Sequence, residues 1–399
     1  MHNFLQVSSI SPLGRDSNNF VYLVSLAKAE PIPASQIRSS TKPGTSSLPV
    51  TTEQIVVRLS NQDAMLNNAA RVENEVAAIK LMREALCDFP AKIVPEVYAW
   101  NTAASGNGWI IQSYMAGQTL AEKLPKLSAN QKEDVLNQVA EIFKTIQGFV
   151  PPVSGFGGLN FDKDGKVVTG PLSMWFSGPF SSFVDMYSYI FQKQLEFASV
   201  TPLVSGWEGT GLEERLEKLN KSGFQKLLQN YAHFEPTLIH GDLGPENILI
   251  NPDTCQITAI LDFDFTHIGS QADEYFYSFA EFHGIVPGPF EGGEMEELRI
   301  AQLDGFKAMN IRGDAAAGCD IDWSLARLWQ KAMERSGMKS PAEIDGIGEL
   351  AAVYWFLLDI CPPFFLLPRW LEKRTKEQQE TSKAAVKASL SKYLDRWGY

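Results

Sequence analysis

Residues 238–265 constrain the fold of this chain more than any other stretch. Two short apolar runs, 248–250 and 257–261, flank an Asn-Pro-Asp turn at 251–253, and such runs are typical of buried strands joined in a hairpin. Polar side chains cluster at the strand ends: His240, Asp242, Asn247, Asp262 and Asp264. Buried carboxylates cost desolvation energy unless they are paired or bind a metal. Hard oxygen ligands of this kind suit Mg²⁺ held together with substrate phosphates.

The spacing of these residues narrows the function further. Asp242 follows His240 by two positions, Asn247 follows Asp242 by five, and Asp262 closes the next strand. This layout resembles the catalytic and metal loops of kinase-fold phosphotransferases. Its HGD and DFD forms resemble the aminoglycoside phosphotransferase and choline kinase-like family. The resemblance implies an α+β, protein kinase-like fold of two lobes, with a small antiparallel sheet and a mostly helical C-terminal lobe. The alternative is a polar hairpin without catalytic function.

The resemblance also implies a role for each polar residue of the hairpin. Asp242 would orient an acceptor hydroxyl and take its proton, while Asn247 and Asp262 would hold Mg²⁺ beside ATP. His240 would brace the loop backbone rather than shuttle protons. Asp264 is either a second carboxylate near the metal or a hydrogen-bonding group of the loop.

The segment after the hairpin contains one more candidate. Asp273 stands where the family has an aspartate at the start of a helix. It would steady the catalytic loop by accepting backbone N–H bonds, or act only as a helix cap. Ser270 or Gln271 is expected to be the N-terminal cap of that helix.

The N-terminal part predicts a nucleotide-binding sheet. Strands are expected at 4–10 and 20–26, at 54–59, and at 93–100 and 109–114. The first connection has one glycine, so it is either an ordinary hairpin turn or a loop over the phosphates. In the second case three polar residues could donate to phosphate oxygens: Ser17, Asn18 and Asn19.

Two charged residues of this sheet and its helix are expected to form an ion pair. Arg58 lies on the third strand, where better-known family members have lysine. A helix over 64–86 carries Glu75 as its partner, and Glu73 is the alternative. The linker between lobes is expected at 112–115, where Gln112, Tyr114 and Met115 would offer backbone groups to an adenine.

Composition limits the partners and the location of the chain. It has 399 residues, and its net charge of −12 argues against nucleic acid or an anionic membrane as partner. A cationic substrate is compatible with that charge. The four cysteines form no CxxC pair, which predicts a reducing, cytoplasmic location without zinc or disulfides. We see no signal peptide, and Pro362 and Pro363 make the apolar stretch 350–371 a buried helix followed by a turn.

The sequence therefore predicts an N-lobe over 1–115, with a flexible insertion at about 30–53, and a C-lobe over 116–399. Helices are expected at 131–149, 181–197, 212–233, 295–311, 321–335 and 343–360, with an exposed terminal helix past 372. Weak candidates for binding a cationic or ring-containing acceptor are Trp175, Phe176, Asp320, Asp322, Trp323, Trp329, Trp355 and Asp359.

Two functions are carried forward. The first is an ATP-dependent O-phosphotransferase acting on a small hydroxyl compound. The second is a catalytically inactive kinase-fold protein that binds a nucleotide or ligand. The choice of ATP over GTP stays open.

Overall fold

The computed structural model of the chain describes residues 6–14, 18–27, 42–102, 106–306 and 321–399. The chain divides into two compact units. The first unit contains Met1–Pro179, Pro236–Phe282 and Leu328–Met338, and the second contains Phe180–Glu235, His283–Arg327 and Lys339–Tyr399. The N-terminal sheet belongs to the first unit, and so does the hairpin predicted at 248–261, which is called the catalytic hairpin for its predicted role. The predicted lobe boundary at residue 115 stays a prediction.

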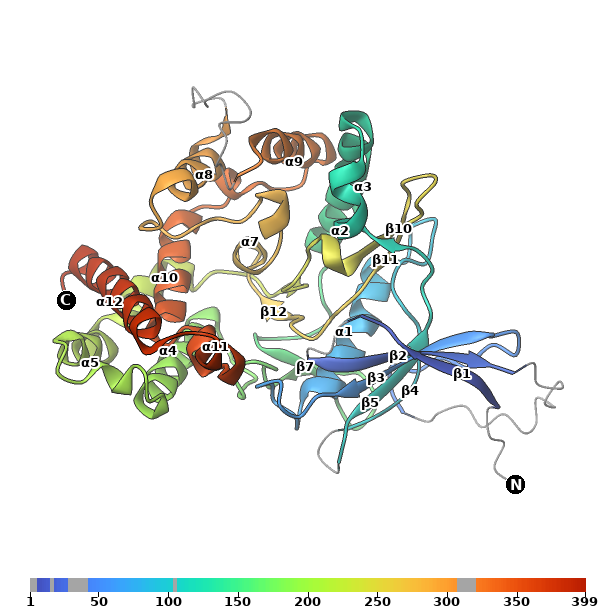
Figure 1. The fold of residues 1–399 in the computed structure, drawn as a ribbon, viewed down its shortest axis with the longest axis horizontal. Coiled ribbons are helices and arrows are strands. Elements are labelled where there is room, and N and C mark those ends of the chain that lie inside the picture. Colours follow the sequence, from blue (N-terminus) through green and yellow to red (C-terminus); the bar gives the residue numbers. More distant parts are fainter. Residues whose placement is uncertain (1–5, 15–17, 28–41, 103–105, 307–320) are drawn as a thin grey trace. The chain divides into compact units, whose positions relative to one another are not determined.

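An antiparallel sheet of five strands forms the N-terminal part of the described chain (Figure 1). Its strands are β1 (Val7–Pro12), β2 (Asn19–Leu26), β3 (Gln54–Ser60), β4 (Val97–Asn101) and β5 (Trp109–Ser113). They lie in the order β1-β2-β3-β5-β4. The predicted strands are present, although the first begins at Val7 rather than at residue 4, and residues 1–5 lie outside the described part. The register sets Arg58 between Val21 and Ile110.

Helix α1 (Arg71–Ala85) packs against β4, β5 and the later strand β7 (Gly158–Phe161). The predicted start at residue 64 is wrong, because residues 61–70 form turns and bends. The side chains of Asn61 and Asn67 accept the N–H groups of residues 63 and 69, and such local bonds compete with a helix. The expected apolar face of α1 is buried, and Arg71, Asn74 and Glu75 are buried as well.

The remainder of the first unit surrounds the catalytic hairpin. It contains β6 (Gln118–Thr119), α2 (Leu120–Lys123), α3 (Ala129–Gly148), β7, β8 (Val167–Gly170), β9 (Thr237–Ile239), β10 (Ile248–Ile250), β11 (Ile257–Ile260), β12 (His267–Gly269) and α7 (Glu274–Tyr277). Ser128 and Gln131 form a capping box at the start of α3, which fixes where the predicted helix begins. Within residues 151–177, β7 pairs antiparallel with β8 in a small hairpin.

The second unit is helical. It contains α4 (Phe183–Val200), α5 (Leu212–Ser222), α6 (Phe224–Leu228), α8 (Gly293–Asp304), α10 (Ile347–Ile360), α11 (Pro368–Glu372) and α12 (Lys376–Trp397), and α9 (Trp323–Ser336) contributes to both units. The predicted helix 212–233 is wrong as one element: it breaks at Gly223, where an added Cβ would collide with the Tyr399 ring. Leu390 and Leu394 of α12 are fully buried, so the terminal helix is not wholly exposed as expected.

The fold class predicted from the sequence is confirmed: the chain is α+β, with an antiparallel N-terminal sheet and a mostly helical C-terminal part. In the part of the chain that the structure describes, the stretch Ile347–Leu366 is long and apolar enough to cross a membrane, with a mean hydropathy of 1.4. Of its most apolar window, 61% is buried inside the protein. The core helix of a soluble protein passes the same test, so this stretch is weak evidence for a membrane span.

Candidate active site

The catalytic hairpin is held by backbone pairing on both sides of β10. This strand pairs antiparallel with β11 and with β6, and its three residues are buried. Beyond the paired residues, the N–H of Leu261 donates to the carbonyl of Asn247 at 2.8 Å. That bond brings Asn247 and the following Asp262 to the same end of the hairpin, as the sequence predicts.

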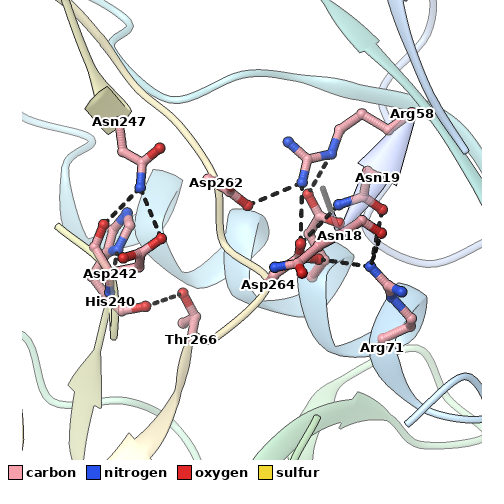
Figure 2. Close-up of polar contacts among 11 residues, drawn as sticks. Asn18, Asn19, Arg58, Arg71, His240, Asp242, Asn247, Asp262, Asp264 and Thr266 are labelled. Atoms are coloured by element: carbon pink, nitrogen blue, oxygen red, sulfur yellow. Dashed lines mark hydrogen bonds and ion pairs between the residues drawn. The ribbon is translucent and has the colours of Figure 1, made fainter. Parts of the chain in front are cut away.

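Asp242 and Asn247 face one another across the loop that precedes β10 (Figure 2). The Asn247 Nδ2 donates to the carbonyl oxygen of Asp242 at 2.7 Å and to its Oδ2 at 3.0 Å. Burial, and then the charge of Asp262, raise the pKa of Asp242 to about 7. Asp242 is therefore poised to exchange a proton near neutral pH.

His240 lies fully buried beneath this loop. Its Nδ1 accepts the N–H of Asp242 at 3.3 Å, and its carbonyl accepts the Thr266 hydroxyl at 3.0 Å. Burial lowers the pKa of His240 to about 4. A neutral ring with these contacts is suited to bracing the loop, and the role of His240 stays a prediction.

Arg58 joins the N-terminal sheet to residues 261–266 after β11, which are called the metal loop for their predicted role. Its Nε lies 3.0 Å from Oε1 of Glu75, and its Nη2 lies 3.1 Å from Oδ1 of Asp262. Although burial lowers the pKa of Arg58, the carboxylates of Glu75 and Asp262 outweigh it and raise the pKa. Of the two glutamates considered for this pair, Glu75 faces Arg58, whereas Glu73 hydrogen-bonds Thr102.

Asp264 forms a second contact between the metal loop and the N-terminal part. Its side chain is 1% exposed, and its Oδ2 accepts the Asn19 Nδ2 at 2.7 Å (Figure 2). It also lies 3.7 Å from the guanidinium groups of Arg58 and Arg71. Asp264 thus bonds residues of the sheet and of α1, a partner set that was not anticipated.

The structure describes some of the residues that are predicted to contact the phosphates and the base. Ser17 lies outside the described residues. The carbonyl of Asn18 accepts Nη2 of Arg71 at 2.7 Å, which sets this residue beside the cluster. Gln112 is buried on β5 and pairs with Val56 of β3. Because Val56 precedes Arg58 by two positions, Gln112 and Arg58 lie on the same face of the sheet.

The segment after β5 connects to the hairpin. Tyr114 is 36% exposed, and Met115 Sδ lies 3.6 Å from the Ser113 hydroxyl. The hydroxyl of Thr258 on β11 donates to the carbonyl of Ala116 at 2.7 Å. The linker is thereby fixed to the hairpin, while its contact with a base stays a prediction.

One expected contact belongs to a different residue. Oε2 and Oε1 of Glu274 accept the N–H groups of His240 and Gly241 at 2.7 and 3.0 Å. Asp273 is expected either to take this task or to act only as a helix cap, and its Oδ2 accepts the N–H of Ser270 at 2.7 Å. The expected cap is also wrong, because Asp273 and not Ser270 or Gln271 occupies the N-cap position of α7. A one-residue shift on a helical turn redirects a side chain by about 100°, so the acidic pair alone did not reveal which residue faces the loop.

The charge of the cluster fits a cation. Three acidic residues, Glu75, Asp262 and Asp264, lie within 4 Å of Arg58 or Arg71, and Asp242 lies near enough to Asp262 for that charge to raise its pKa. Among the described residues the buried Oδ1 of Asp264 has no hydrogen-bond partner. Asn247 turns its amide nitrogen to Asp242, which leaves its oxygen directed elsewhere (Figure 2).

A magnesium ion would find few protein ligands here. Among the described residues, no group of three or more His, Cys, Asp or Glu side chains could hold a metal by itself. Mg²⁺ is usually bound by one or two carboxylates plus substrate phosphates, so the residues present fit a metal that arrives with a nucleotide.

Several weak acceptor candidates have other roles. Trp329 is fully buried against Phe279 and Phe282, and is a core residue. Asp322 accepts the N–H of Leu325 near the start of α9. Asp320 lies outside the described residues.

The sequence matches the model of the phosphotransferase enzyme family over residues 46–282. That range contains Arg58, Glu75, the whole catalytic hairpin and Glu274. A search of curated proteins found no significant match to this chain.

Solved structures with a similar fold include aminoglycoside phosphotransferases. APH(4)-Ia is 14% identical, with 99% of this chain and 95% of that chain covered and a TM-score of 0.48. A thermostable mutant of it in ternary complex with ADP and hygromycin B is 13% identical, with 98% and 94% covered and a TM-score of 0.48. ADP-bound APH(2'')-Ib is 12% identical, with 97% and 95% covered and a TM-score of 0.43. At these identities and scores the likenesses say nothing about substrates.

Proposed function

This chain belongs to the phosphotransferase enzyme family, and from that premise we propose that it transfers the γ-phosphoryl group of ATP to a hydroxyl group of a small molecule. One observation carries the proposal: Asp242 hydrogen-bonds Asn247 at 3.0 Å, and Asp262 at the same end of the hairpin contacts Arg58 at 3.1 Å. This cluster supports the proposal because Asp242 would accept the proton, Asn247 and Asp262 would supply oxygen ligands for the metal, and Arg58 would bind phosphates.

Asp242 is the residue that we assign to the acceptor. Its carboxylate accepts a hydrogen bond from the acceptor hydroxyl and orients the oxygen toward the γ-phosphorus. As the new P–O bond forms and the bond to the β-phosphate oxygen breaks, the hydroxyl proton passes to Asp242 and ADP leaves. The raised pKa of Asp242, about 7, suits a group that takes a proton late in such a step.

Asn247 and Asp262 are the residues that we assign to Mg²⁺. When bound, Mg²⁺ offsets the negative charge of the phosphates in the transition state. In the structure Asp262 is paired with Arg58 at 3.1 Å. The Arg58 guanidinium has five N–H donors on three nitrogens, so it can keep Glu75 on its Nε while other N–H groups bond a phosphate.

The base and the acceptor are less defined. The segment 112–115, with Gln112, Tyr114 and Met115, is proposed to bind the adenine through backbone groups. The acceptor is proposed to be a small hydroxyl compound, and the net charge of −12 favours a cationic one. A cytoplasmic location is part of the same proposal.

Calorimetric titration with ATP in the presence and absence of Mg²⁺ tests the proposal first. The same protein is then screened for ADP release with amines, sugars and antibiotics that carry hydroxyl groups. Asp242→Asn is expected to abolish acceptor-dependent ADP release and to keep ATP binding. Asp262→Asn is expected to remove the effect of Mg²⁺ on ATP binding.

The matched control is Glu246→Gln, because Glu246 is exposed in the same loop. It should behave as the wild type in both assays. Mg²⁺-dependent ATP binding without transfer to any acceptor would favour the second candidate, an inactive nucleotide-binding protein. A wild-type chain that binds ATP no better with Mg²⁺ than without would refute the proposed use of the metal site.

A further inference from the structure

Arg71, the first residue of α1, is almost completely buried, with 1% of its surface exposed. Its guanidinium donates to the carbonyls of Asn18 and Asn61 at 2.7 and 3.0 Å, and to Oδ1 of Asn19 at 3.1 Å. Asn18 directly precedes β2 and Asn61 directly follows β3. The buried guanidinium of Arg71 therefore bonds the start of β2 and the end of β3. These bonds offset the cost of burying its charge.

The same guanidinium reaches the metal loop. Nη2 of Arg71 lies 3.7 Å from Oδ1 of Asp264. Asn19 bridges the two groups, because its Nδ2 donates to Asp264 at 2.7 Å while its Oδ1 accepts from Arg71. Figure 2 shows these three side chains around one point, with Asp262 on the other side of Asp264. Segments 245 residues apart are joined here.

Asp262 needs such support from its surroundings. Its φ of +63° is the left-handed conformation, which residues with a Cβ adopt at an energetic cost. Its side chain is about one-third exposed and faces Arg58. Asp264 is two residues further along an irregular segment, so a fixed Asp264 limits the backbone angles open to Asp262.

We propose that Arg71 and Asn19 are positioning residues of the phosphotransferase site, which hold Asp264 and thereby keep Asp262 in the conformation that binds Mg²⁺ with ATP. The inference rests on the proposed function, because it requires Asp262 to serve as a metal ligand. Groups behind metal ligands orient them, and their replacement lowers metal affinity by about 10- to 100-fold.

Two variants test the inference. Arg71→Lys keeps the charge but replaces a fork by one ammonium group, which does not reproduce the same set of bonds. The double variant Arg71→Met/Asp264→Leu removes both buried charges together, an exchange that proteins often tolerate without loss of stability. If Arg71→Lys does not fold, the effect of Mg²⁺ on ATP affinity can still be measured on the double variant.

The measurement is calorimetric affinity for ATP with Mg²⁺ and with EDTA, together with circular dichroism and thermal unfolding of each protein. The gain is the ratio of ATP affinity with Mg²⁺ to ATP affinity with EDTA. In both variants this ratio is expected to be about 10- to 100-fold smaller than in the wild type. The matched control is Arg83→Met on the same helix, which cuts a partly exposed pair with Glu96. It should keep the full gain.

The possible results separate the inference from the proposed function. If the wild type gains no affinity from Mg²⁺, both are overturned. If the wild type and the control gain affinity, and the folded double variant gains equally, the inference alone is overturned. If folded Arg71→Lys, which retains Asp264, loses the gain while the control keeps it, the inference is supported, because a merely structural role would reduce the active fraction rather than the effect of Mg²⁺. If folded Arg71→Lys gains as much as the wild type and only the double variant loses the gain, Asp264 acts on Mg²⁺ directly and the inference is overturned.

Discussion

Asn74 tests how the structure holds the metal loop in place. Its side chain is fully buried on α1. Nδ2 donates to the carbonyl of Thr266 at 2.9 Å, and Oδ1 accepts the N–H of Leu159 at 2.6 Å. One neutral amide therefore joins β7 to the segment that follows Asp262. Asn74→Ala removes a partner from a buried donor and a buried acceptor at once.

The expected loss follows from these two bonds. A buried polar group that loses its partner costs about 1–3 kcal/mol. Alanine is a better helix former than asparagine by up to about 0.7 kcal/mol, which offsets part of the loss. The free energy of unfolding should therefore fall by about 1–5 kcal/mol. For a unit of this size, a central value of about 3 kcal/mol lowers the unfolding temperature by roughly 6–12 °C.

Urea unfolding followed by tryptophan fluorescence measures the loss, and hydrogen exchange locates it at the amide of Leu159. The matched control is Asn137→Ala in α3, because the buried Oδ1 of Asn137 has no hydrogen-bond partner in the part of the chain that the structure describes. That change should be neutral or slightly stabilising. An Asn74→Ala protein that loses no more stability than Asn137→Ala, with unchanged exchange at Leu159, would refute the reasoning.

Four further predictions concern the site. Burial and then the charge of Asp262 raise the pKa of Asp242 to about 7, so kcat/KM should fall as the pH is lowered through about 7. Additional Mg²⁺ should move the midpoint of this fall to a lower pH, because a nearby cation favours the ionised carboxylate. pH–rate profiles at two Mg²⁺ concentrations check both results. Arg58→Lys should raise KM for ATP about tenfold, because one charge-assisted bond is lost; unchanged ATP kinetics would contradict this. Glu75→Gln should weaken ATP binding and Glu73→Gln should not, since of these two glutamates Glu75 is the one that contacts Arg58. Calorimetric ATP titration of both isosteric variants checks this, and equal affinities would contradict it. Gly241→Ala should lower the unfolding temperature, because φ is +81° and a Cβ would lie 2.6 Å from a backbone oxygen; equal melting curves would count against it.

The catalytic hairpin was predictable because its signals are local. Apolar runs at 248–250 and 257–260 became β10 and β11, since a short apolar segment beside a turn has few other ways to bury its side chains. The spacing from Asp242 to Asn247 survives in the structure as a direct hydrogen bond. The pair of Arg58 with Glu75 was expected from the family resemblance, and the packing of α1 against the sheet brings it about.

Errors arose where contacts outside the apolar pattern decide the outcome. Helix α1 begins at Arg71 rather than at residue 64, because Asn61 and Asn67 bond nearby backbone N–H groups in the turns at 61–70. The helix predicted over 212–233 breaks at Gly223, against which the C-terminal Tyr399 packs closely. The apolar periodicity of these segments was correct, but periodicity encodes neither local side-chain bonds to the backbone nor a partner from elsewhere in the chain.

The sequence by itself determined the α+β class, the catalytic hairpin and the chemical types of the residues at its end. These depend on side-chain alternation and on short spacings along the chain. In a strand or a turn the backbone geometry sets the relative positions of side chains that are close in sequence. Only the tertiary structure decided that Glu274 rather than Asp273 receives the loop N–H groups, and that Arg71 and Asn19 hold Asp264. Each of these contacts joins segments that pack together only once the sheet, α1 and the hairpin share one core, so no short spacing in the chain records them.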